Sequence, residues 1–171
     1  MKKDKKKYGC VMLFFDFPEI KKIHDKIDSE DIYNSNIKDE YGLEKESHVT
    51  LLYGLHNDIK DKDVFDIIKN QKFNNVFIEN PSIFDNEEYD VFKFDVKENK
   101  NLNSSNKDLK TLPFTSDYPD YHPHLTIGYL KKGMGKKYIK LLKEENYKLI
   151  PKFVVYSKSD GTKQKLTLSK I

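Results

Sequence analysis

The stretch that decides the fold is His48-Val49-Thr50-Leu51-Leu52-Tyr53, which returns 76 residues later as His124-Leu125-Thr126-Ile127-Gly128-Tyr129. Both copies have the pattern His-x-Thr-apolar-x-Tyr. Side chains of a β-strand alternate between the two faces of its sheet. On a strand, each copy therefore places its histidine and its threonine on one face. We expect the apolar residue and the tyrosine on the opposite face, against a core.

The same order of elements surrounds each copy: a strand, a helix, a long connection, the motif strand, a helix and a further strand. The expected strands are 8–17, 48–55, 73–84, 89–96, 124–130, 152–158 and 163–169, and the expected helices are 61–70, 98–112, 136–145 and one that opens at Pro18. This recurrence predicts one domain, 1–171, made of two pseudo-repeats at about 8–84 and 89–169. We predict an α+β fold in which two antiparallel sheets, related by a pseudo-two-fold axis, form a central concave cleft with helices packed outside.

Composition limits the classes of function. A chain of 171 residues with 37% hydrophobic and 35% charged residues is typical of one soluble globular domain. A net charge of +3 does not indicate a protein that coats duplex nucleic acid. The single cysteine, Cys10, excludes a disulfide framework. No long charge-free apolar stretch follows the basic segment Met1 to Lys7, so we expect neither a signal peptide nor a membrane span, and a cytoplasmic location.

Arginine is absent, so all 31 basic residues other than histidine are lysines. A guanidinium fork for phosphate is therefore missing. Phosphate must be held by hydroxyl groups, backbone N–H groups, histidine or lysine. The expected cation near a phosphate is Lys158 or a lysine near Lys131.

Two imidazoles that face one space are suited to in-line displacement at a phosphorus atom. One neutral histidine takes a proton from the attacking oxygen, and the other, as imidazolium, gives a proton to the departing oxygen. The threonines would donate hydrogen bonds to the non-bridging oxygens, where negative charge is held. We therefore predict a catalytic group that needs neither a metal nor a cofactor, made of His48, Thr50, His124 and Thr126.

A metal site is the alternative use of the histidines. His122, His124 and His48 are three ligands of a type that zinc accepts, with a position left open. Against this, Pro123 interrupts the alternation between His122 and His124, and neither motif contains a carboxylate or a cysteine. We expect His122 in a loop at the cleft rim, and His24 and His56 on the surface.

The strings Ser47-His48-Val49-Thr50-Leu51 and Pro123-His124-Leu125-Thr126-Ile127 resemble the paired motifs of the 2H phosphoesterase superfamily, and the likeness in spacing covers nearly the whole chain. The resemblance implies a bilobal α+β fold and metal-independent chemistry on 2′,3′-cyclic phosphates, 2′,5′ linkages or cyclic oligonucleotides. The string Tyr121 to Thr126 and the Lys- and Asn-rich composition are most similar to small phage-encoded members. One branch of these destroys the cyclic-oligonucleotide signals of bacterial CBASS defence, which implies action in the host bacterial cytoplasm.

Aromatic rings near the motifs are candidates for holding a base, because a ring face stacks on a nucleobase. The loop 115–122 before the second motif is expected to act as a lid. Three functions stay open: cleavage of 3′–5′ linkages in small cyclic oligonucleotides, processing of 2′,3′-cyclic or 2′,5′-linked RNA ends, and sequestration of nucleotides without turnover. The predicted substrate-binding residues are Tyr8, Tyr118, Tyr121, His122 and Lys158.

Overall fold

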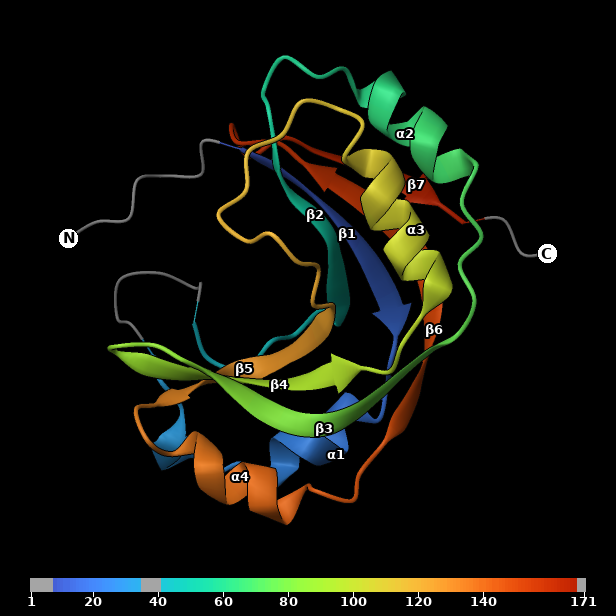
Figure 1. The fold of residues 1–171 in the computed structure, drawn as a ribbon. Coiled ribbons are helices and arrows are strands. Elements are labelled where there is room, and N and C mark those ends of the chain that lie inside the picture. The colour runs from blue at the N-terminus through green and yellow to red at the C-terminus, as the bar shows by residue number, and fades with distance from the viewer. Residues whose placement is uncertain (1–7, 35–40, 169–171) are drawn as a thin grey trace.

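The computed structural model describes residues 8–34 and 41–168, so the lysine-rich segment 1–7 lies outside the described residues. Strands and helices occur at all the predicted places, with ends that differ by a few residues (Figure 1). The strands are β1 (Gly9–Asp16), β2 (His48–Leu55), β3 (Val76–Asp85), β4 (Tyr89–Val96), β5 (His124–Lys131), β6 (Tyr147–Ser157) and β7 (Lys163–Thr167). The helices are α1 (Ile20–Asp25), α2 (Asp61–Lys69), α3 (Lys100–Leu109) and α4 (Gly135–Leu141), with a 3-10 turn at Ser29–Asp31.

The strands form one continuous antiparallel sheet in the order β1-β2-β5-β4-β3-β6-β7. Strand β6 also pairs with β1, so the strands from β1 to β6 in this order form a closed ring, and β7 flanks β6. Figure 1 shows β3, β4 and β5 running across the direction of β1 and β2. The α+β class is therefore confirmed. The expected division into two sheets is not, because the two halves are parts of one bent sheet.

The helices cover the outer face of this sheet in two pairs (Figure 1). Helix α3 packs on β2 and on α2, whereas α4 packs on β3 and β4. Helix α1 follows β1 in sequence but lies beside α4, where the Asp28 amide just after it donates to the Tyr138 hydroxyl at 2.9 Å. Each lobe thus contains elements from both halves of the chain, and we propose that 1–171 folds as a single domain for this reason.

The core lies between the helices and the outer face of the strands. The apolar residues that alternate along each strand supply it, as do the stripes of the helices. None of the helices in the described ranges is long and apolar enough to cross a membrane. Side chains with no exposed surface include Leu13, Leu51, Phe92, Phe94, Ile127 and Val154.

Candidate active site

The two motif strands, β2 and β5, meet at one backbone-paired position, where Val49 lies opposite Leu125. Both residues point to the core and have no exposed surface. Their neighbours on each strand point to the concave face, where they are half-buried. The structure therefore brings together the four motif residues, which are His48, Thr50, His124 and Thr126.

The antiparallel pairing fixes how these four side chains are arranged. Residues on either side of a paired position oppose each other crosswise, so each histidine lies opposite the threonine of the other motif. Side chains directly opposite each other on one face are about 5 Å apart at Cβ. One phosphate group can therefore contact an imidazole and a hydroxyl from both strands.

Both imidazoles are held by the same contact. Nδ1 of His48 lies 3.0 Å from the Glu46 carbonyl oxygen, and Nδ1 of His124 lies 3.0 Å from the His122 carbonyl oxygen. A carbonyl only accepts, so Nδ1 carries the proton in each ring. Nε2 is the nitrogen left for proton transfer in both histidines.

A β-bulge follows the threonine in both motifs. In β2, Leu51 is an extra residue between the paired positions Thr50 and Leu52. In β5, Ile127 is an extra residue at the same place in the motif. An extra residue reverses the alternation of all side chains beyond it.

The bulges overturn the prediction that Tyr53 and Tyr129 face the core. Both tyrosines return to the face of the histidines, and Tyr53 is 45% exposed. Each ring lies against a tyrosine at the start of a neighbouring strand. Tyr8 comes directly before β1, and Tyr89 is the first residue of β4. The ring centroids are 6.4 Å apart for Tyr53 and Tyr8, and 5.5 Å apart for Tyr129 and Tyr89. The concave face is therefore aromatic on both sides of the four motif residues.

The bulged residues are held by side chains from the helices. The Asn106 Nδ2 of α3 donates to the Leu51 carbonyl oxygen at 2.7 Å. The His24 Nε2 of α1 lies 3.2 Å from the Ile127 carbonyl oxygen. The prediction that His24 is a surface residue is wrong, because this part-buried ring is a second partner of a carbonyl that also accepts from the Glu44 amide at 2.8 Å.

Replacing Asn106 by leucine should destabilise the fold by about 1–3 kcal/mol, because a buried carbonyl loses its donor. Asn106 is only 6% exposed, so water does not easily replace the amide. Denaturant unfolding measures the change. The matched control is Asn103→Leu on the exposed side of the same helix, which should stay within about 0.5 kcal/mol of the original protein. Equal losses in the two variants would contradict the role of Asn106.

The His48 side of the site is aromatic. Phe14 lies opposite His48 on β1, and the two rings are 5.1 Å apart. Phe153 of β6 stacks on Phe14 at 5.1 Å with an interplanar angle of 16°. A flat group bound next to His48 therefore has an apolar wall beside it.

The His124 side carries both an aromatic ring and charge. The Phe84 ring lies edge-on to the His124 imidazole, with ring centroids 4.8 Å apart. Lys93 lies opposite Thr126 on β4 and is 7% exposed, and its Nζ is 2.7 Å from both the Asp95 carboxylate and the Ser82 hydroxyl. Sequence reasoning missed this cluster. The signal was present, because Lys93 and Asp95 alternate with buried phenylalanines and so belong on the face of His124.

Burial lowers the pKa of His124 below its ordinary value of 6.5. The charge of Lys93 acts in the same direction, as does His48, whereas the bond to the His122 carbonyl and the charge of Asp95 oppose the shift. At neutral pH this imidazole is therefore uncharged and able to accept a proton at Nε2.

The segment before the second motif runs beside β2. The Thr115 amide donates to the Gly54 carbonyl oxygen at 2.9 Å, and the Tyr121 hydroxyl donates to the Thr50 carbonyl oxygen at 2.8 Å. Burial raises the pKa of Tyr121. Its hydroxyl thus ties the loop to the motif strand and is already bonded when a substrate arrives.

The other predicted substrate-binding residues lie in different places. Tyr118 is 79% exposed, and His122 is exposed at the rim, where its carbonyl group holds His124. Tyr8 stacks on His56 at 5.8 Å, at the end of β1 and β2 far from His48. Of the five predicted substrate-binding residues, Tyr121 and His122 are the two with a hydrogen bond to a motif residue.

Lys158 is not brought to the four motif residues. Its Nζ pairs with Asp61 of α2 at 2.6 Å and lies 5.8 Å from the centre of the buried Tyr156 ring. These contacts place the charge on the helix side of the sheet. The lysine that does lie beside a motif residue is Lys93.

The metal alternative required His48, His122 and His124 to converge. Within residues 8–34 and 41–168, no group of three or more histidine, cysteine or acidic side chains is arranged to hold a metal ion. The ring of His122 is exposed, in keeping with the interruption by Pro123.

Two solved structures from Kluyveromyces marxianus match almost the whole chain. One is Usb1, with a TM-score of 0.61 and 11% identity over 96% of this chain and 99% of the other. The fold is that of Usb1. The second is Usb1 with uridine monophosphate, with a TM-score of 0.59 and 10% identity over 96% of this chain and 100% of the other. At this level of identity the likeness shows the fold alone, and neither protein-family models nor curated sequences match the chain.

Proposed function

We propose that the protein is a phosphodiesterase that cleaves nucleotide linkages by acid–base catalysis between two histidines, without a metal. The observation that carries the proposal is the crosswise group of two imidazoles and two hydroxyls on one face, with Nδ1 of each ring fixed by a carbonyl. A structural role for the histidines does not require two rings held alike beside two threonines.

The environment of each ring suggests which step it performs. We assign the base to His124, which is neutral at pH 7, and the acid to His48. A ribose 2′-hydroxyl attacks phosphorus and gives its proton to Nε2 of His124. The bond from phosphorus to the departing 5′-oxygen breaks, and that oxygen takes a proton from Nε2 of His48. Thr50 and Thr126 donate to the non-bridging oxygens. The products are a 2′,3′-cyclic phosphate, which water can open, and a free 5′-hydroxyl.

The substrate that we propose is a small cyclic oligonucleotide with 3′–5′ linkages, of the kind used as a bacterial immune signal. The two aromatic sides of the concave face suit a ligand with a base on each side of the phosphate. Short RNA ends are the second candidate, favoured by the solved complex of Usb1 with uridine monophosphate.

A substrate panel in EDTA tests the proposal. The panel contains cyclic di- and trinucleotides, linear 2′,5′-oligoadenylate and 2′,3′-cyclic mononucleotides, and the products are resolved by chromatography. Cleavage of the cyclic oligonucleotides is expected. Cleavage of only the last two groups would replace the first substrate class with the second. Loss of all activity in EDTA would contradict metal independence, and intact ligands recovered from tight complexes would indicate sequestration.

The acidic limb of the pH–rate profile should respond to the charges around His124. Lys93→Met removes a charge that lowers the pKa of His124, so the pKa rises and the limb moves to higher pH. Asp95→Asn removes a charge that raises this pKa, so the limb moves to lower pH. The profile of kcat/KM reports the free enzyme. A limb that moves in neither variant would show that His124 is not the base.

A further inference from the structure

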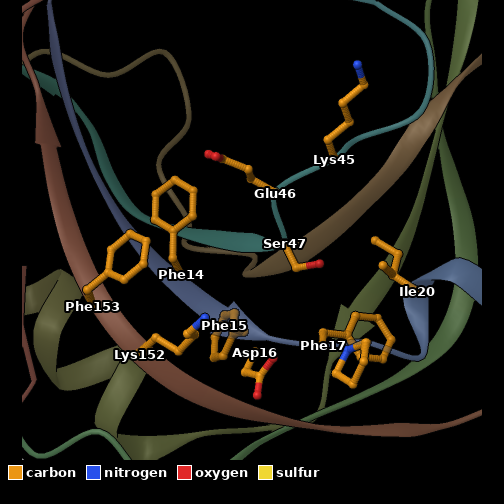
Figure 2. Close-up of a pocket in the computed structure, with 11 residues that line it drawn as sticks. Phe14, Phe15, Asp16, Phe17, Ile20, Lys45, Glu46, Ser47, Lys152 and Phe153 are labelled. Carbon is orange, nitrogen blue, oxygen red and sulfur yellow. The ribbon is translucent and has the colours of Figure 1, made fainter.

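A pocket of about 360 Å³ opens beside the first motif (Figure 2). Its walls come from the end of β1, the segment 45–47 before β2, and β6. This volume falls in the range of roughly 300–1,000 Å³ that small-molecule sites occupy. Figure 2 shows Phe14 and Phe153 on one side of the pocket, Ile20 and Phe17 on the opposite side, and Ser47 between them.

The pocket adjoins the His48 side of the site through two of its lining residues. Phe14 lines the pocket, and its ring is 5.1 Å from the imidazole of His48. Glu46 also lines it, and the carbonyl of this residue fixes Nδ1 of His48. A group bound in the pocket therefore lies next to the histidine that gives up the proton.

The lining fits a flat, uncharged group with polar edges. The stacked rings of Phe14 and Phe153 supply an apolar wall, and Lys165 covers Phe153 at 4.0 Å from the ring centre. Two lysines and two carboxylates line the pocket, so their charges balance. A pocket without net positive charge does not favour a second phosphate. A nucleoside has this chemistry, since its base is flat and its ribose hydroxyls and ring nitrogens bond to charged side chains. The charged lining residues are Lys45, Lys152, Asp16 and Glu46.

Building on the proposed function, we infer that this pocket binds the departing nucleoside, whose 5′-oxygen is protonated by His48. When the bond from phosphorus to this oxygen breaks, its electron pair stays on the oxygen, and Nε2 of His48 supplies the proton. The site is directional under this assignment. The attacking nucleotide lies toward His124, and the departing one lies against Phe14 and Phe153.

The test compares substrates with and without a departing nucleoside. Phe153→Ala should raise KM for dinucleoside 3′,5′-monophosphates about tenfold, equivalent to about 1.4 kcal/mol, because part of the apolar wall beside the departing nucleoside is lost. The same variant should lose much less kcat/KM on 2′,3′-cyclic mononucleotides, because they lack a departing nucleoside. Phe153→Leu, which keeps apolar volume, guards against loss of folding and should give an intermediate KM. Phe77→Ala, at a half-exposed ring on β3, is the matched control and should change neither substrate.

Equal effects of Phe153→Ala on both substrates, or none on the dinucleoside monophosphates, would overturn the pocket assignment. A binding measurement separates failure of the pocket assignment from failure of the proposed function. Its ligand is a 2′-deoxy dinucleoside monophosphate, which lacks the attacking hydroxyl and is not cleaved. If the original protein cleaves no substrate but Phe153→Ala weakens this binding about tenfold, the catalytic proposal fails and the pocket stands. If binding is unchanged, the pocket fails.

Discussion

Replacing either motif histidine by alanine should lower kcat by about 10²- to 10⁴-fold, because each ring performs one proton transfer. His48→Ala and His124→Ala remove the group at Nε2 while the backbone pairing of Val49 and Leu125 stays. Both side chains are half-buried, and each ring bonds to the backbone only two residues away. The fold should therefore survive, which circular dichroism and thermal unfolding can verify.

The matched control for the loss of an imidazole is His24→Gln on α1, which retains a donor for the Ile127 carbonyl. This variant should keep nearly the original kcat. The double variant His48→Ala/His124→Ala should be only slightly slower than the worse single variant, because residues that act as a unit are not additive. Near-normal turnover in both single variants would remove the catalytic proposal.

Gly54→Ala should cost more than about 4 kcal/mol of folding free energy, an exceptional value for one methyl group. The residue has φ +117°, and a Cβ there would lie 2.1 Å from the Thr115 carbonyl oxygen. The segment that carries Tyr121 and leads to His124 would have to move away from β2. We therefore expect kcat/KM to fall as well in the fraction that folds.

Gly161→Ala separates the steric effect from the backbone effect. Gly161 has φ +91° in the turn between β6 and β7, and a Cβ there would meet no other atom within 4 Å. This control should lose only the cost of a strained backbone, about 1–3 kcal/mol. Denaturant unfolding of both variants gives the difference, and equal losses would show that close approach to Thr115 does not matter.

The four motif residues were predictable because period-two alternation is local. Val49 and Leu125 are buried and their neighbours are not, as the pattern indicated. The same reasoning failed at Tyr53 and Tyr129, since a bulge reverses the alternation and depends on helices that are distant in sequence. Asn106 lies 55 residues from the carbonyl that it holds.

The surroundings of the motifs were less predictable. Lys158 was expected near phosphate because it follows a late strand, but its partner Asp61 comes from a helix on the outer face. Lys93 was overlooked among apolar neighbours, although its place in the alternation put it beside His124. The pairing of β6 with both β1 and β3 arises from the length of one strand, which the separate elements do not reveal.

The most direct test of acid–base division between the histidines is a change of leaving group. The measurement is kcat/KM of both histidine variants on a dinucleoside 3′,5′-monophosphate and on the matching nucleoside 3′-(4-nitrophenyl phosphate), whose nitrophenolate departs without a proton. We predict that His48→Ala recovers most of its about 10²- to 10⁴-fold loss on the nitrophenyl ester, whereas His124→Ala stays impaired on both substrates. Equal impairment of the two variants on both substrates would contradict the division of acid and base work between His48 and His124.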